Sequence, residues 1–198
     1  MLTSFSRRFK LEAVKRSRRS TLTPTDWLNA ALKALERGGL DAVRVVALSE
    51  ALGASRGSFY WHFRNRADLL GRMLEHWEAE ITDWVLAATH AAGGSAEERF
   101  HVLLEDVLER RRGRYELAIR AWAMHDRKAA ATVRRCDRKR LDFVAGLFRE
   151  MGFGAAESRA RARLTLAYLE GDHIVLVREA PADRRRFLEL RHRLLTSR

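Results

Sequence analysis

The stretch Arg44–Leu70 constrains the fold more than any other part of the chain, because it predicts two short helices joined by a tight turn. Val45, Leu48 and Leu52 recur at helical spacing and give the first helix one apolar face. Gly53 follows, and glycine readily adopts the left-handed conformation that a sharp turn requires. The sequence therefore predicts a helix-turn-helix, with a third helix directly after it.

The second helix of this motif, expected over residues 55–63, carries polar and aromatic residues outside its apolar face. Ser55 is suited to cap it, because a serine hydroxyl can accept a hydrogen bond from the free N–H near Ser58. Phe59 and Phe63 lie four residues apart and are expected to pack onto the first helix. Such a helix is about 12 Å long at ~1.5 Å per residue, and the major groove of B-DNA is about 12 Å wide. The outward side chains are therefore candidates for DNA contact.

The residues after the turn follow a known family pattern. The segment Y-W-H-F-R-N-R-A-D-L-L resembles the Y-x-H-F-x-x-K-x-x-L-type signature of the TetR (tetracycline-repressor) family of bacterial transcriptional regulators. The matching positions are Tyr60, His62, Phe63, Arg66 and Leu69. The resemblance implies an all-α fold, with an N-terminal three-helix helix-turn-helix domain and a C-terminal helical bundle for ligand binding and dimerisation. It also implies a homodimeric cytoplasmic repressor that binds a palindromic operator in double-stranded DNA.

The DNA-binding site is predicted to comprise Arg44, Ser55, Arg56, Gly57, Ser58, Tyr60, Trp61, His62 and Arg66. Base contacts are assigned to the start of the second helix, where an arginine can pair with guanine through two hydrogen bonds. By resemblance, Tyr60, His62 and Arg66 are assigned to phosphates. Two positions depart from the family pattern. Arg44 stands where a capping Ser or Thr is usual, and Ser49 stands where a small alanine is usual, so its hydroxyl needs a carbonyl partner.

The remaining residues follow helical spacing, with no sustained alternation of apolar and polar residues. Thr23 is expected to cap a helix that Gly38 and Gly39 stop, and Asn65 to cap one continuous helix through Ala88. Further helices are predicted to begin at a capping box formed by Ser95 and Glu98, and at Asp126. The last two helices are expected over about 155–179 and 181–196. The predicted divisions are a basic arm (1–20), the helix-turn-helix domain (21–70) and the ligand-binding and dimerisation domain (71–198).

A small, largely apolar effector is the second predicted partner, because family members commonly hold one between the central helices of the larger domain. The candidate residues are Trp84, Phe100, Leu104, Val107, Trp122, Met124, Phe148 and Tyr168, although for each residue taken alone a core position is the stronger interpretation. From composition alone the last two helices could equally be core helices of a monomer, but the resemblance implies that they form the dimer interface. Its candidate residues are Leu164, Ala167, Tyr168, Gly171, Val175, Phe187, Leu190 and Leu194.

The net charge of the 198-residue chain is +12, but the excess is not concentrated on the motif. Residues 1–20 carry a net +6, residues 21–80 a net −1, and residues 81–198 the remaining +7. The basic arm is interpretable either as a phosphate-binding segment or as a solubilising tail. A nonspecific basic nucleic-acid-binding protein therefore stays open as an alternative function.

An enzyme is the other rival class. The chain contains no G-x-S-x-G, H-E-x-x-H, P-loop or G-x-G-x-x-G motif, and no cofactor is predicted. His76 and Glu80 lie four residues apart and Asp172 adjoins His173, but two ligands do not make a zinc site, so no metal is predicted either. Cys136 is the only cysteine and is expected to be a small buried residue in a helix, which suits a reducing cytoplasm. No apolar run is long enough for a membrane span.

Overall fold

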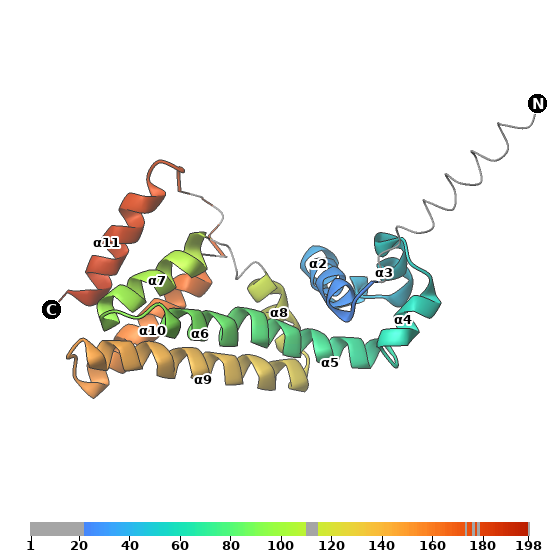
Figure 1. Cartoon of the computed structure of the whole chain (residues 1–198), viewed down its shortest axis with the longest axis horizontal. Helices are drawn as coiled ribbons and strands as arrows, with labels where there is room; N and C mark the ends of the chain where they lie inside the picture. The colour runs from blue at the N-terminus through green and yellow to red at the C-terminus, as the bar shows by residue number, and fades with distance from the viewer. Residues whose placement is uncertain (1–21, 110–114, 173, 176, 178, 198) are drawn as a thin grey trace, which may run out of the picture.

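The computed structural model describes residues 22–109, 115–172, 174–175, 177 and 179–197, and every regular element in these ranges is helical (Figure 1). This confirms the predicted all-α fold. The helices are α2 (Pro24–Ala42), α3 (Val45–Leu52), α4 (Arg56–His62), α5 (Arg66–Trp77), η1 (Glu78–Asp83), α6 (Trp84–Ala91), α7 (Ala96–Glu109), α8 (Glu116–Ala123), α9 (Arg127–Glu150), α10 (Ala155–Gly171) and α11 (Arg184–Thr196).

A long helical rod runs through the molecule and links its two ends (Figure 1). It consists of α5, η1 and α6, and the backbone stays right-handed helical at both junctions. The predicted continuous helix over 65–88 is thus present and extends to Ala91. Its middle segment, η1, is wound as a π-helix, which the sequence pattern did not predict. α9 lies alongside the rod, and α11 and α4 lie at opposite ends of the molecule (Figure 1).

The predicted helix starts are confirmed by side-chain hydrogen bonds. Thr23 and Asp26 form a capping box, because each side chain accepts from the other residue's backbone N–H. Ser95 and Glu98 form the same arrangement. The carboxylate of Asp126 accepts from the N–H of Ala129 at 2.8 Å. These caps satisfy N–H groups that have no partner within their own helix.

Two hydrophobic cores stabilise the fold. The first contains the inner faces of α2, α3, α4 and α5, and it continues to Ile119 on α8 and to Val133 and Cys136 on α9. Cys136 is fully buried in a helix, as predicted. The second core lies between α6, α7, α9, α10 and α11, around Phe100 and Phe148, whose ring centroids are 4.9 Å apart. The first core thus crosses the domain boundary predicted at residue 70, which stays a prediction.

The regular helix that begins at Pro24 is interrupted at Gly38 and Gly39, as predicted, because both have non-helical backbone angles, with Gly39 at φ 64°; a short helical segment then continues to Ala42. Two other predicted helix boundaries differ from the structure. α10 ends at Gly171 rather than near residue 179, and α11 begins at Arg184 rather than at residue 181. In the described ranges, no helix has both the length and the apolar character that crossing a membrane requires.

Candidate functional site

The turn between α3 and α4 is formed by local backbone geometry. Gly53 adopts φ 61° and ψ 32°, the left-handed conformation predicted for it. The N–H of Ala54 then donates to the carbonyl of Ser49 at 2.8 Å. The hydroxyl of Ser55 accepts from the N–H of Ser58 at 3.2 Å, so α4 begins with the predicted cap.

Two phenylalanines fix α4 against the rest of the molecule. Phe59 and Phe63 are buried, with their rings stacked at 5.3 Å, and Phe59 also meets the edge of Trp27 at 5.4 Å. The next residues face solvent, since Tyr60 is 60% exposed and Trp61 is 87% exposed. Burying two large rings while exposing two others fixes the orientation of this short helix and leaves an aromatic outer face.

The other predicted DNA-contacting residues lie on the same outward side or at its edge. Ser55, Arg56 and Gly57 are exposed at the start of α4, whereas Ser58 and His62 are half-buried. Arg44 is exposed at the residue preceding α3 and makes no capping hydrogen bond, as the departure from the family pattern predicted. The structure therefore brings the predicted residues of α4 and Arg44 to one end of the molecule (Figure 1).

Arg66 has a different environment from the one expected of a phosphate ligand. Its Nε donates to the carbonyl of Val43 and its Nη2 to the carbonyl of Leu40, each at 2.6 Å. These contacts tie the start of α5 to the end of α2 and use two of the five N–H donors of the guanidinium. Ser49, the second departure from the family pattern, is buried and its hydroxyl lacks a hydrogen-bond partner in the described part of the chain.

A cluster of ion pairs, which we call the central cluster, joins α8, α9 and α10. Arg140 Nη1 lies 3.1 Å from Glu116 Oε1 and 3.0 Å from Glu170 Oε1. Arg120 donates to both carboxylate oxygens of Asp137, at 2.7 and 3.1 Å, and to Glu170 Oε2 at 3.1 Å. Burial raises the pKa of Glu170, and the neighbouring carboxylate of Glu116 raises it further. The cluster thus holds charged groups in the interior of the bundle.

The π-helical segment η1 is tied to α9 by a second set of ion pairs. The carboxylate of Glu78 is buried and accepts from Arg135 Nε and from Lys139 Nζ, both at 2.9 Å. The hydrogen bond from Arg135 is the main reason that the pKa of Glu78 falls to about 2. Thr82 accepts from Arg140 Nε at 3.1 Å, which connects η1 with the central cluster. The middle of the rod is therefore held by polar contacts to α9.

A cavity of about 60 Å³ lies above the central cluster, between η1, α6, α7, α9 and α10. Its polar lining consists of Thr82, Glu116, Arg140 and Glu170. Its apolar lining consists of Ile81, Val85, Leu86, Leu103, Val107, Val144, Leu166 and Leu169. Val107 is the one predicted effector residue in this wall. The charged residues were missed, although Glu116 and Arg120 interrupt the otherwise apolar stretch Tyr115–Met124.

The other predicted effector residues do not meet at this cavity. Phe100, Leu104 and Phe148 are buried in the second core, and Tyr168 is half-buried beneath the guanidinium of Arg191, 5.0 Å from its ring centroid. Trp84 is 43% exposed and Met124 is 79% exposed, so both side chains face largely outward. The buried members of this set are core residues, the alternative interpretation that the sequence left open.

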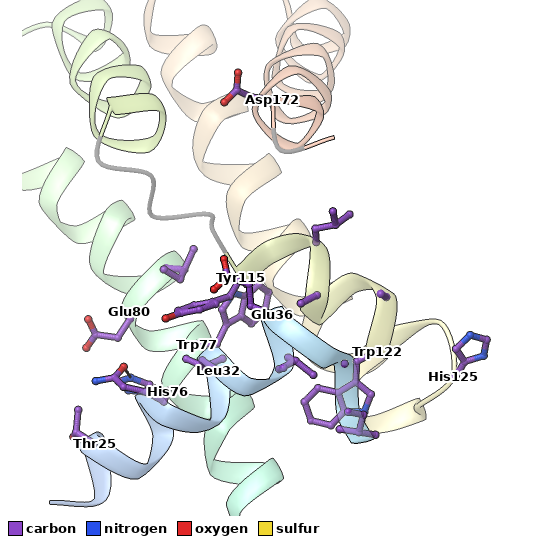
Figure 2. Close-up of a pocket in the computed structure, with 18 of the residues that line it drawn as sticks. Thr25, Leu32, Glu36, His76, Trp77, Glu80, Tyr115, Trp122, His125 and Asp172 are labelled. Atoms are coloured by element: carbon purple, nitrogen blue, oxygen red, sulfur yellow. Dashed lines mark hydrogen bonds between the residues drawn. The ribbon is translucent and has the colours of Figure 1, made fainter. Parts of the chain in front are cut away.

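A wider, open cleft of about 1200 Å³ is lined by residues of α2, α5, η1 and α8 (Figure 2). Trp122, a predicted effector residue, lines it together with Trp77, His76 and Glu80. Figure 2 shows that these side chains come from helices on different sides of the cleft. Because the cleft lies between α2 and α8, its width depends on how the helix-turn-helix end packs against the rest of the molecule.

The predicted dimer residues lie on α10, on α11 and between them. Leu164 and Leu194 are 62% and 66% exposed, and Val175 and Leu190 are exposed as well. Ala167 is exposed, whereas Tyr168, Gly171 and Phe187 are half-buried. These helices therefore carry more apolar surface than the fold of one chain covers.

His76, one of the two histidines considered as metal ligands, has its Nε2 3.3 Å from Asn29 Oδ1. The other, His173, lies outside the described residues. Among the residues that the structure describes, no group of three or more potential ligands is placed to hold a metal ion.

Residues 28–73 match the model of bacterial regulatory proteins of the tetR family. Over 90 residues the chain is 30% identical to the HTH-type transcriptional regulator AcrR of Shigella flexneri. Over 59 residues it is 39% identical to the class A tetracycline repressor protein from transposon 1721 of Escherichia coli. These matches cover 43% and 30% of this chain and 42% and 27% of the two relatives, so the chain spans less than half of each.

Solved structures resemble this fold over most of its length. A TetR-family transcriptional regulator from Rhodococcus sp. has a TM-score of 0.69 at 21% identity, with 88% of this chain and 98% of that chain covered. A transcriptional regulator from Rhodococcus sp. Rha1 has a TM-score of 0.67 at 19% identity, with 88% and 94% covered. At these identities the likeness concerns the fold alone.

Proposed function

We propose that this chain, a member of the tetR family of bacterial regulatory proteins, is a sequence-specific transcriptional regulator that binds operator DNA through α4. The observation that supports this most is the orientation of that helix. Phe59 and Phe63 anchor it from inside, so Tyr60 and Trp61 face solvent at 60% and 87% exposure. Large aromatic side chains are rarely left so exposed unless a partner covers them.

Individual DNA contacts are assigned from the exposure of each side chain and from whether its hydrogen-bond donors are already used within the chain. Arg56, at the first turn of α4, is assigned to a guanine, which it can contact through two hydrogen bonds. Arg44, Tyr60 and His62 are assigned to phosphates, and Trp61 to the groove wall. Ser55 and Ser58 also belong to the interface, where Gly57, lacking a side chain, permits close approach. We leave Arg66 out, because its guanidinium already donates to two backbone carbonyls.

In a dimer, the second subunit would contribute a second copy of α4, the helix proposed to contact DNA. Exposed apolar residues on α10 and α11, among them Leu164 and Leu194, are proposed to pack against their two-fold mates. Two copies of α4 would then contact half-sites about 34–36 Å apart, one turn of B-DNA, or another spacing that the operator matches. A palindromic operator in the cytoplasm is the partner that this symmetry favours.

We further propose that the regulator is a repressor released by a small effector in the cavity above the central cluster. Ile81 and Thr82 of η1 line this cavity. In the same helical rod η1 is continuous with α5, which directly follows α4 in the chain. An effector that widens the cavity would displace the rod and change the separation of the recognition helices. To release DNA, it must bind the non-DNA state more tightly than the DNA-bound state.

Binding to the DNA upstream of the protein's own gene, compared with a scrambled duplex of equal length over a salt series, tests the DNA-binding proposal. We expect protection of two symmetric half-sites and a preference for the native sequence. Arg56→Ala should lower that preference about tenfold or more, the effect of one lost arginine–guanine pair. Arg185→Ala is the matched control, because this arginine on α11 has a side chain 90% exposed and lies far from α4 (Figure 1).

Equal affinity for both duplexes would contradict sequence-specific regulation and favour the nonspecific nucleic-acid binder. Failure to bind either duplex at low salt would remove DNA from the proposed function and reopen the enzyme class.

A further inference from the structure

We infer that the effector of the cavity above the central cluster is an organic monocation, with an apolar chain and a protonated amine or quaternary ammonium head. This inference rests on the proposed effector site and adds to it the charge class of the ligand. It is based on the composition of the central cluster, on the walls of the cavity and on the contacts that the charged groups make.

Among the residues that the structure describes, the central cluster contains one carboxylate more than its cations balance. Glu116, Asp137 and Glu170 are three acids, whereas Arg120 and Arg140 supply two positive charges. All of these side chains are at least half-buried, and the whole side chain of Glu116 is only 4% exposed. An unbalanced charge away from water is costly, and one added cation would complete the set.

The neighbouring ion pairs do not supply the missing charge. Glu78 and Asp83 are matched by Arg135 and Lys139, so that group is neutral by itself. Arg140 links the two groups only through its hydrogen bond to the uncharged hydroxyl of Thr82. The excess carboxylate therefore stays with the central cluster.

Two of the three carboxylates of the central cluster lie at the wall of the cavity, whereas Asp137, with a side chain 33% exposed, lies away from it. Glu116, Arg140 and Glu170 line the cavity directly, and most other lining residues are aliphatic. Since each water needs roughly 10–15 Å³ of such space, about 60 Å³ corresponds to a few waters or a short alkyl chain. An amphipathic cation matches both surfaces: its chain meets Val85, Leu103 and Val107, and its head meets the carboxylates.

Glu170 is the carboxylate most responsive to such a ligand. Its pKa is raised, first by burial and then by Glu116, so it holds a proton more readily than an ordinary glutamate. A cationic head in the cavity would favour the ionised form of Glu170, whereas a neutral or anionic ligand would not.

Three probes with the same five-carbon chain test the inference: pentylammonium, pentan-1-ol and pentanoate. Their affinities for the full-length protein are measured by chemical-shift titration near neutral pH. We expect pentylammonium to bind at least about tenfold more tightly than the alcohol, as one buried charged hydrogen bond would give, and pentanoate to bind most weakly.

Glu170→Gln removes the excess charge while keeping the shape of the side chain. This variant should lose the preference for the ammonium probe and still bind pentan-1-ol as the unaltered protein does, which also shows that the cavity remains folded. Glu157→Gln, on the exposed start of α10, is the matched control and should retain the full preference.

Equal binding of the ammonium and alcohol probes would overturn the charge class while leaving the cavity as an effector site. Persistence of the preference in Glu170→Gln would overturn the role of the central cluster. If no probe bound, both the effector site and its charge class would be wrong. The DNA titration would still judge the regulator independently, because it needs no effector.

Discussion

The inner face of the helix-turn-helix and the central cluster both hold side chains in the interior, but they are held together by opposite kinds of interaction. Around α4, aromatic rings of residues close in sequence pack together, with Trp27 as the more distant partner. Around Arg140, charged groups separated by 24 and 30 residues are paired in the interior. The difference indicates that α4 is built to keep one fixed orientation, whereas the middle of the molecule retains polar contacts that a ligand can rearrange.

The aromatic anchor of α4 carries the largest expected effect. Phe59→Ala should lower the free energy of unfolding by about 4 kcal/mol, because it removes a fully buried ring and leaves a cavity beside Trp27 and Phe63. Urea unfolding followed by circular dichroism measures this. Trp61→Ala, two residues away but 87% exposed, should change the stability by less than about 0.5 kcal/mol. Similar losses in the two variants would contradict the inside–outside orientation of α4.

A substitution in the central cluster tests the second region, where buried charged groups take the role that buried aromatic rings have around α4. Arg140→Met should cost about 3 kcal/mol, since it removes one of the two arginines that pair with Glu116 and Glu170 and leaves Arg120 to face both carboxylates. Adding Glu170→Gln to this variant should recover part of the loss, because one uncompensated carboxylate is then neutral. Arg134→Met, on an exposed position of the same helix, is the control. No recovery in the double variant would show that the loss is one of packing rather than of charge.

The two regions also differ in how well the sequence predicted them. Gly53, Ser55 and Phe59 act through neighbours a few residues away, so spacing alone located the turn, the cap and the anchor. The central cluster depends on which helices become neighbours, and no local pattern pairs Arg140 with Glu170. The π-helical winding of η1 was missed as well. The buried Glu78 in this segment pairs with Arg135 on α9, and the local sequence does not show that contact. Arg66 matched a family position, yet its hydrogen bonds to the end of α2 are visible only in the folded chain.

The contribution of Glu78 to the stability of the fold depends on pH. Its pKa is lowered to about 2, mainly by the hydrogen bond from Arg135, so its ionised form stabilises the folded state. That contribution is complete above the ordinary pKa near 4.5 and is lost as the pH falls from there toward 2. Glu78→Gln should therefore cost about 2 kcal/mol at pH 7, and the difference should shrink steadily below pH 4.5.

Urea unfolding at pH 7, 5, 4 and 3 measures this dependence. Glu105→Gln, an exposed carboxylate on α7, is expected to show no such trend. A constant difference between Glu78→Gln and the unaltered protein across these pH values would argue that the side chain contributes shape alone.

The smallest expected effects concern Arg44 and Arg66, two arginines that the sequence assigned to the same DNA interface. Arg44 is exposed and makes no capping hydrogen bond, so Arg44→Ala should reduce the log–log salt slope of operator binding by about 0.9, the effect of one lost phosphate contact. Its stability should be unchanged. Arg66→Ala should do the reverse, because two carbonyls at the end of α2 lose their donor, which costs about 1–2 kcal/mol of stability. A reduced slope in Arg66→Ala without loss of stability would return this arginine to the phosphate contacts, and its hydrogen bonds to α2 would then be replaceable.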